Sequence, residues 1–302
     1  MTLTELRYIV AVAQERNFRR AAQRCFISQP ALSLAVQKLE EELGIRIFER
    51  SKTEVSVTPI GDRVIEQAQR ALEEIAQIKA LAGQGKNPLA GPLRLGVIYT
   101  IGPYLLPELI PALHEKAPHM PLEVEENTTA NLEQLLRNGR IDAAIVALPF
   151  EVPGVETRPL YDEPFATVVP KTHPWAKRAS IKAEELASEK VLLLASGHCF
   201  SNQVVEACPE LQRNGGEVLQ GNSLETLRNM VASGLGITVL PRSAISPRHN
   251  SPLLKVISFK APAPSRRVAL AWRKSFARRP AMDALAAAIR TLQIPGIKHL
   301  SR

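Results

Sequence analysis

Apolar positions along the first 58 residues follow the spacing of short amphipathic helices. Leu6, Ile9, Val10 and Ala13 recur at intervals typical of one buried helical face. Residues 18–25 predict a second short helix, and residues 29–43 predict a third. Ser28 supplies an N-cap hydroxyl just before the third helix, and Gly44 follows it as a typical C-terminal stop. The chain therefore begins with three predicted helices.

The third predicted helix has an apolar side and a polar side when its residues are placed about 100° apart. Its apolar arc holds Ala31, Leu32, Ala35, Val36, Leu39 and Leu43. Its polar arc holds Gln29, Pro30, Ser33, Gln37 and Glu40, while Leu34 falls outside the apolar arc. A recognition helix needs polar side chains at the N-terminal end that enters the major groove of DNA. A solvated face on a three-helix core has the same pattern, so both interpretations stay open here.

Basic residues cluster before the turn that precedes this helix. The cluster is Arg16, Arg19, Arg20 and Arg24. Such residues are well placed to contact DNA phosphates, which supply most of the salt-dependent affinity. Farther on, residues 48–50 lead into residues 55–58, which predicts a β-wing whose Arg50 contacts the DNA backbone or minor groove.

Residues 59–82 predict one long helix, because no glycine follows Gly61 and no proline follows Pro59. Its apolar positions alternate between intervals of four and three residues, which is typical of a seam for a partner helix. These positions are Val64, Ala68, Ala71, Ile75, Ile78 and Ala82. Packing of this face on its own domain is the alternative. Residues 83–92 are rich in glycine and proline and predict a hinge.

From Leu93 onward, short apolar runs alternate with helical patterns, which predicts an α/β domain with mostly parallel strand pairing. Strands are expected at 93–97, 141–148, 165–170, 191–195, 237–240 and 267–272. Helices are expected at 105–115, 131–138, 224–233 and 281–292.

Length and charge narrow the class of protein. The 302 residues suit about two domains, and the net charge of +8 is compatible with a polyanionic partner. No uncharged apolar run reaches the roughly 18 residues of a membrane-spanning helix, which excludes an integral membrane protein. The N-terminus lacks the pattern of a secretory signal, so we expect a cytoplasmic protein.

Cysteine is scarce: Cys25, Cys199 and Cys208 are too few for a disulfide scaffold. Cys199 falls where a predicted strand meets a short helix, and the free N–H groups and dipole of a helix N-terminus favour thiolate over thiol. His198 adjoins it, and Arg266 is our candidate for a cation near the sulfur. Cys25 lies on an inward helical face and is interpreted as a core residue.

Cys208 follows Cys199 by nine residues. If the residues between them are helical, their Cα atoms lie about 13 Å apart at about 1.5 Å per residue. A disulfide needs them within about 7 Å, so forming it would require the segment to unwind. A zinc site, two inert buried cysteines and a redox switch are the three interpretations of the pair. We expect no cofactor and no bound metal.

The N-terminal motif resembles the winged helix-turn-helix of the LysR-type transcriptional regulators. The residues that carry the resemblance are Leu6, Phe18, Ala21, Ala22, Ser28, Gln29, Pro30, Ser33, 38–44, Phe48, Arg50, Thr58, Pro59 and Gly61. The resemblance implies that double-stranded DNA is bound through Arg19, Arg20, Ser28, Gln29, Pro30, Ser33 and Arg50.

The resemblance covers the whole chain and implies three parts. Residues 1–58 would form the DNA-binding domain, and 59–89 a linker helix and hinge that dimerises. Residues 90–302 would form a two-lobed effector domain resembling periplasmic binding proteins. One lobe would hold about 90–162 and 268–302, and the other about 163–267. Members of the family form homodimers and often homotetramers.

Within the family, the chain resembles the members that sense hydrogen peroxide. This resemblance rests on residues 19–22, 102–107, 173–176, 197–199, 208 and 223–231. It implies that Cys199 is the peroxidatic residue and Cys208 the resolving residue of a reversible disulfide. It also implies that Thr100, Thr129 and His198 hold the peroxide. Residues 200–207 match these members only in part.

The resulting hypothesis is a non-enzymatic activator of oxidative-stress genes that recruits RNA polymerase and is reset by glutaredoxin or thioredoxin. One alternative is a LysR-type regulator that responds to a small metabolite bound between the lobes. A second alternative, from another class, is a thiol peroxidase, which would not need residues 1–82. A solute-binding protein is a third, and the missing signal and the helix-turn-helix argue against it.

Overall fold

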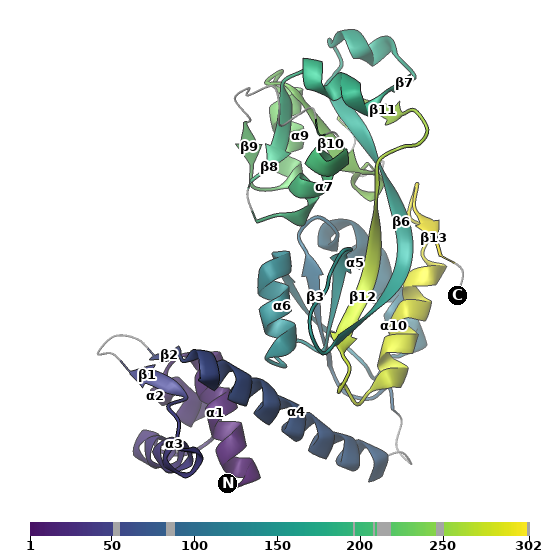
Figure 1. Cartoon of the computed structure of the whole chain (residues 1–302). Coiled ribbons are helices and arrows are strands. Elements are labelled where there is room, and N and C mark those ends of the chain that lie inside the picture. Colours follow the sequence, from purple (N-terminus) through teal and green to yellow (C-terminus); the bar gives the residue numbers. More distant parts are fainter. Residues whose placement is uncertain are drawn as a thin grey trace.

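The computed structural model describes residues 1–50, 55–82, 88–195, 197–207, 209, 219–245 and 251–300. A small helical domain stands at one end of the molecule and an α/β body at the other (Figure 1). The helix α4 (Pro59–Ala82) leaves the small domain and runs beneath the body. Within the described residues, no helix is both long enough and apolar enough to cross a membrane.

The N-terminal domain has the elements that the hydrophobic pattern predicts. They are α1 (Leu3–Glu15), α2 (Phe18–Arg24), α3 (Gln29–Leu43), β1 (Phe48–Arg50) and β2 (Val55–Val57). The Ser28 hydroxyl accepts the Ala31 N–H at 3.4 Å, and Gly44 ends α3 with φ of 66°. β1 and β2 pair antiparallel as the expected wing.

The helical wheel of α3 is correct for most positions and wrong for three. Leu32, Val36 and Leu39 are buried, and Leu34 is 68% exposed as expected. Ala31 and Leu43 are exposed although both lie in the apolar arc. Glu40 is buried although it lies in the polar arc, because its carboxylate accepts the N–H groups of Ile47 and Phe48 at 2.7 and 3.0 Å. These amides lie beyond the helix, where a wheel cannot place them.

The apolar seam of α4 divides into two parts. Ala68 belongs to the core of the N-terminal domain, and Val64 and Ala71 pack against that core. The alternative of packing on its own domain is therefore correct for the first half of the seam. Farther along the helix, Ile78 is 65% exposed. Ile78, in the distal half, is thus a seam side chain open to a partner helix.

The first half of the α/β body is built around three parallel strands. β3 (Leu93–Ile98) lies between β4 (Leu122–Asn127) and β5 (Ala143–Ala147). Its helices are α5 (Gly102–Lys116), α6 (Thr129–Arg137) and α10 (Arg279–Thr291). Because β3 and β4 are parallel, their carboxyl ends meet at one edge of the sheet.

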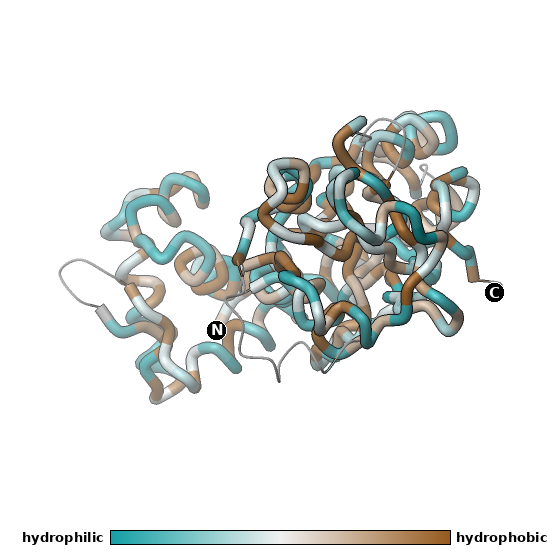
Figure 2. The backbone as a smooth tube through the Cα atoms, turned by 90° about the horizontal axis from the view of Figure 1, so that it is seen from above, coloured by the Kyte–Doolittle hydropathy of each residue, from teal (hydrophilic) through white to brown (hydrophobic). Residues whose placement is uncertain are grey.

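The second half has its own hydrophobic core. Its strands are β7 (Ser180–Ile181), β8 (Val191–Leu194), β9 (Gln220–Gly221), β10 (Ile237–Pro241) and β11 (Leu254–Phe259). Its helices are η1 (Pro174–Lys177), η2 (Ala183–Ser188), α7 (Cys199–Ala207), α9 (Leu224–Ala232) and η3 (Arg242–Ala244). Figure 2 shows hydrophobic segments gathered inside the body.

Two long strands join the halves and correct the expectation of mostly parallel pairing. β6 (Val155–Pro170) and β12 (Ser265–Arg273) pair antiparallel along their length, because the chain crosses between the halves in opposite directions. β6 also pairs antiparallel with β10, β11 and the short β13 (Lys298–His299). Parallel pairing is confined to the strands within each half.

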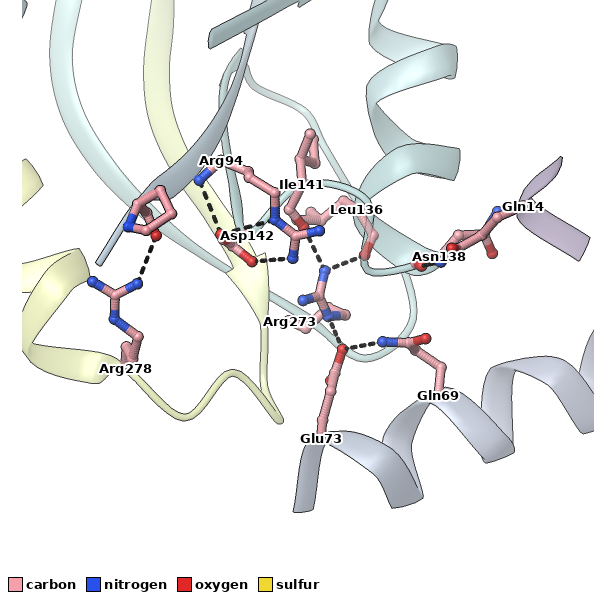
Figure 3. Close-up of polar contacts among 11 residues, drawn as sticks. Gln14, Gln69, Glu73, Arg94, Leu136, Asn138, Ile141, Asp142, Arg273 and Arg278 are labelled. Atoms are coloured by element: carbon pink, nitrogen blue, oxygen red, sulfur yellow. Dashed lines mark hydrogen bonds and ion pairs between the residues drawn. The ribbon is translucent and has the colours of Figure 1, made fainter. Parts of the chain in front are cut away.

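Polar contacts join α4 and the N-terminal domain to the bottom of the body (Figure 3). Arg273, at the end of β12, donates to the carbonyls of Leu136 and Ile141 and forms an ion pair with Glu73 of α4 at 2.5 Å. Gln14 of α1 donates to the Asn138 carbonyl at 2.6 Å. The sequence pattern predicts none of these contacts.

Candidate functional site

Cys199 is the first residue of α7 and lies where the two halves of the body meet. Gly197 precedes it with φ of 101°, a conformation that favours glycine and lets the chain turn from β8 into the helix. Cys199 is half-buried, and it packs against the core of the first half although α7 belongs to the second. Backbone N–H groups at the start of α7 have no partner within the helix and favour negative charge there.

A small, narrow pocket lies beside this cysteine. It is lined by Ile98, Tyr99, Thr100, Asn127, Thr128, Thr129, Gly197, His198 and Cys199. The structure therefore brings together Thr100, Thr129, His198 and Cys199, as the sequence predicts. The carboxyl ends of β3 and β4 supply the threonine side of the pocket, and the start of α7 supplies the thiol side.

Arg266 lies behind the pocket, not among the residues that line it. Its Nη1 donates to Thr100 Oγ1 at 2.7 Å, and its Nη2 donates to the Thr100 carbonyl at 2.9 Å. The guanidinium lies 5.3 Å from the ring centre of Phe200 and pairs with Glu163 at 2.7 Å. Arg266 thus adjoins the residue after Cys199 and holds one wall of the pocket through Thr100.

The polar groups around the pocket are arranged for a small hydrogen-bonding molecule. Thr129 Oγ1 is buried, and within the described part of the chain it has no hydrogen-bond partner. Burial lowers the pKa of His198, so its imidazole is neutral near pH 7 and offers one donor and one acceptor nitrogen. Its ring lies 5.9 Å from that of Tyr99.

Cys208 lies outside the described residues. α7 extends to Ala207, the residue before it, so the segment after Cys199 is helical as expected. That helix places Ala207 about 12 Å along the axis from Cys199, at about 1.5 Å per residue.

Sequence reasoning missed Tyr99, Asn127 and Glu163. Tyr99 and Asn127 adjoin Thr100 and Thr128 at the same strand ends, so extending each strand end by one residue finds them. Glu163 pairs with Arg266 across the β6–β12 ladder. Glu163 and Arg266 are 103 residues apart in the sequence, so no periodic pattern predicts their contact.

The expected DNA-binding residues lie on α2, α3 and the wing. Arg19 and Arg20 are exposed on α2, and Gln29 and Pro30 are exposed at the start of α3. Ser33 is half-buried one turn later. The Ser28 hydroxyl accepts the cap hydrogen bond described above, and Arg50 lies in β1 with its side chain outside the described part of the structure.

A helix-turn-helix with a wing, joined by a long helix to a two-part α/β body, defines a DNA-binding transcription regulator. Residues 3–62 match the family model of the bacterial regulatory helix-turn-helix protein, lysR family. Residues 86–293 match the LysR substrate binding domain. The chain belongs to the LysR family of transcription regulators.

Among relatives, the chain is similar to the DNA-binding transcriptional dual regulator OxyR of Escherichia coli K12. The two are 39% identical over 290 residues, which cover 96% of this chain and 95% of that one. A hydrogen peroxide-inducible genes activator of Haemophilus influenzae is 36% identical over 96% of both chains.

Solved structures of OxyR are similar over nearly the whole chain. A full-length cysteine-to-aspartate variant of OxyR from Pseudomonas aeruginosa is 52% identical, with a TM-score of 0.90 over 100% of this chain and 99% of that one. A hydrogen peroxide-bound cysteine-to-serine mutant of OxyR from Corynebacterium glutamicum is 35% identical. Its TM-score is 0.65 over 96% of this chain and 91% of that one.

Proposed function

We propose that this regulator senses hydrogen peroxide through a reversible disulfide between Cys199 and Cys208. The observation that carries the proposal is the pocket in which Cys199 meets Thr100, His198 and the buried Thr129 hydroxyl, for which the described residues offer no hydrogen-bond partner. A buried hydroxyl without a partner costs about 1–3 kcal/mol, so a ligand that satisfies it is favoured there. Relatives described as hydrogen peroxide-inducible genes activators, and an OxyR structure with hydrogen peroxide bound, point to the same ligand.

The size of the pocket disfavours a metabolite. Sites for ordinary small molecules enclose roughly 300–1,000 Å³. The space beside Cys199 is too narrow in this structure for even a water molecule to enter, so a ligand as small as hydrogen peroxide needs the least opening. This difference disfavours the alternative in which a small metabolite acts at this position.

The proposed oxidation proceeds in two steps. The Cys199 thiolate attacks one oxygen of hydrogen peroxide, so an S–O bond forms, the O–O bond breaks, and the second oxygen leaves as hydroxide. Hydroxyls of Thr100 and Thr129 and the neutral imidazole of His198 hold the two oxygens. The Cys208 thiolate then attacks the sulfur of the sulfenic acid and expels hydroxide. Overall, two thiols and one peroxide give one disulfide and two waters.

The second step requires α7 to unwind. The helix separates its two ends by about 12 Å, whereas a disulfide needs Cα atoms within about 7 Å. We infer that this local refolding changes how the effector domains pack in a homodimer or homotetramer. The altered assembly then binds double-stranded DNA in a different register, recruits RNA polymerase and activates oxidative-stress genes. Because the cytoplasm keeps thiols reduced, glutaredoxin or thioredoxin resets the switch there.

DNA recognition in this proposal uses the exposed N-terminal end of α3. Gln29, Pro30 and Ser33 face the major groove, and Arg19 and Arg20 contact phosphates, with Arg50 of the wing on the backbone or minor groove. Ser28 contributes by fixing the start of the helix that carries them. The two parts, thiol site and DNA-binding domain, make a regulator, which turns over no substrate.

Thiol-labelling mass spectrometry before and after stoichiometric hydrogen peroxide tests the proposal. Cys199 and Cys208 should lose their thiols together. Cys25 should stay labelled as an internal control, because burial raises the pKa of its thiol. Cys199→Ser should abolish peroxide induction of a reporter gene.

Two results would reject the proposal. If Cys199→Ser retains peroxide induction, the signal acts elsewhere, as in the metabolite-regulated alternative. If the protein consumes peroxide continuously with a reductant at the rate of a peroxidase, the enzymatic alternative holds.

A further inference from the structure

A fully buried ion pair stands directly behind the thiol pocket. Glu163 of β6 and Arg266 of β12 face each other in the ladder, and both side chains are 0% exposed. Burying two charges costs several kcal/mol per ion unless the remaining donors and acceptors are also satisfied. Such a pair therefore needs further contacts that hold it in one geometry.

Those contacts run from the second half of the body to the pocket. Glu163 Oε1 accepts the Ser243 N–H of η3 at 2.8 Å, and Oε2 accepts Arg266 Nε at 2.7 Å. The guanidinium continues to Thr100, on both its hydroxyl and its carbonyl. The chain of contacts thus ends on a side-chain hydroxyl that lines the pocket.

The direction of the last hydrogen bond determines what Thr100 can do. A guanidinium only donates, so Thr100 Oγ1 must be the acceptor. The single hydrogen of the Thr100 hydroxyl is then left for a partner on the pocket side. Without the guanidinium, this hydroxyl could rotate and donate to a neighbouring carbonyl instead.

We propose that Glu163 is a positioning residue for the thiol pocket. It fixes the Arg266 guanidinium, which makes the Thr100 hydroxyl a donor to the peroxide oxygen that leaves as hydroxide. Glu163 touches neither peroxide nor sulfur and acts through two other side chains. The inference rests on the proposed peroxide chemistry of Cys199 and adds a residue to its machinery.

Two reactions of Cys199 separate positioning from mere structural support. In the full-length protein with Cys208→Ser, oxidation stops at the sulfenic acid, so its rate reports the first step alone. Alkylation of the same sulfur by iodoacetamide releases iodide and needs no donor from Thr100. A defect confined to peroxide therefore identifies lost positioning of the leaving oxygen.

Glu163→Gln should slow the peroxide reaction about tenfold to a hundredfold, less than the roughly hundredfold to thousandfold for outright loss of a preorganised donor, because the Thr100 hydroxyl stays but loses its fixed orientation. Ser243 and Arg266 donate to two different oxygens of Glu163, and in the amide one of these positions becomes an NH2 donor, so one contact is lost. The alkylation rate should stay unchanged. Asp162→Asn is the matched control, because Asp162 pairs with Arg267 at 2.7 Å one step along the same ladder, on the exposed side. It should leave both rates unchanged.

Glu163→Asp tests the positioning role if the Glu163→Gln variant does not fold. It keeps the charge, but its carboxylate is one methylene too short to reach both partners, so the same selective loss is expected. Thr100→Val completes a double-mutant cycle. If Glu163 acts through Thr100, adding Glu163→Gln or Glu163→Asp to Thr100→Val should slow peroxide oxidation no further.

The positioning role is overturned if peroxide and alkylation rates fall together, if neither falls, or if the two substitutions are additive. Failure of the proposed function would give a different kinetic result. In that case, Cys199 of the unsubstituted protein would react with hydrogen peroxide no faster than Cys25 does.

Discussion

Two threonines at the strand ends have different roles although they are neighbours in sequence. The Thr128 hydroxyl caps α6 by accepting the Asn131 N–H at 3.4 Å. Thr129 carries the buried hydroxyl that has no partner within the described residues. Thr128 therefore stabilises the fold, whereas Thr129 serves the ligand in the proposed function.

Thr129→Val should separate stability from reactivity. Valine keeps the shape and removes an unsatisfied polar group, so the free energy of unfolding should stay equal or rise by up to about 1 kcal/mol. Peroxide oxidation of Cys199 should slow by about tenfold, the equivalent of one lost hydrogen bond of about 1.4 kcal/mol. Urea denaturation and thiol-oxidation kinetics measure the two effects.

Thr128→Ala is the comparison, and it should cost about 1 kcal/mol of stability through loss of the cap. If Thr129→Val destabilised the protein as much as Thr128→Ala does, its hydroxyl would serve the fold and not a ligand.

His198 should make stability depend on pH. Burial lowers the pKa of His198 below its usual 6.5. As pH falls from 6.5 toward that lowered value, the unfolded chain binds this proton more readily than the folded one, so stability declines. His198→Gln should remove this part of the decline. Urea midpoints at about pH 7.5 and pH 5.5, compared between the two proteins, measure it, and equal pH dependence in both would contradict the assignment.

At the residue scale, the resemblance supplied Thr100, Thr129 and His198, and the structure brings all three to the pocket beside Cys199. The two threonines meet because the parallel strands β3 and β4 end at one edge of the sheet. Sequence reasoning could not find Glu163, because a buried charge pair depends on which strands become neighbours. The burial of Glu40 was not predicted for a related reason, since its hydrogen-bond partners are backbone amides outside its own helix.

At the scale of elements, the helix α7 carries Cys199 at its N-terminus and, in the proposed switch, has to unwind before a disulfide forms. The helix propensity of α7 should therefore set the balance between reduced and oxidised protein.

Asn202→Ala tests that balance, because Asn202 is exposed within α7. Alanine favours the helix by up to about 0.7 kcal/mol, so the disulfide should become about threefold less favoured against glutathione. The rate of the first oxidation of Cys199 should stay unchanged. Asn229→Ala, an exposed position in α9, is the matched control and should not alter the equilibrium. If Asn202→Ala leaves the disulfide equilibrium unchanged, α7 does not unwind.

Helices with regular periodicity were predictable and the long joining strand was not. α2 to α4 differ from the expected ranges by at most one residue, because each has a capped start and one apolar face. Of β6, only the last third was predicted as a strand. Its first part, Val155 to Pro164, is partly exposed and mostly polar, so it shows no apolar run.

At the scale of the whole molecule, we expect the distal half of α4 to contact another copy of the chain in the proposed homodimer. Ile78 is 65% exposed there, whereas the proximal seam is already packed on the N-terminal domain. Ile78→Glu should weaken dimerisation with little change in the stability of the single chain, because an exposed substitution removes no internal contact.

Analytical ultracentrifugation across a range of protein concentrations measures the effect, with Gln67→Glu on the exposed side of the same helix as control. An unchanged dissociation constant for Ile78→Glu would place the interface elsewhere.

The contacts of Arg273 and Gln14 with the rest of the molecule could not be predicted from the sequence, since single polar residues far apart in the chain show no periodic pattern.

Cys199 is half-buried and packs against the core of the half to which α7 does not belong. If its sulfur moves toward Cys208 in the proposed switch, the first half loses van der Waals contacts that close-packed interiors do not readily replace. The strands around the vacated position would then have to shift or admit water. Oxidation of a sulfur carried by the second half would in this way alter the packing of the first half before the two sulfurs join.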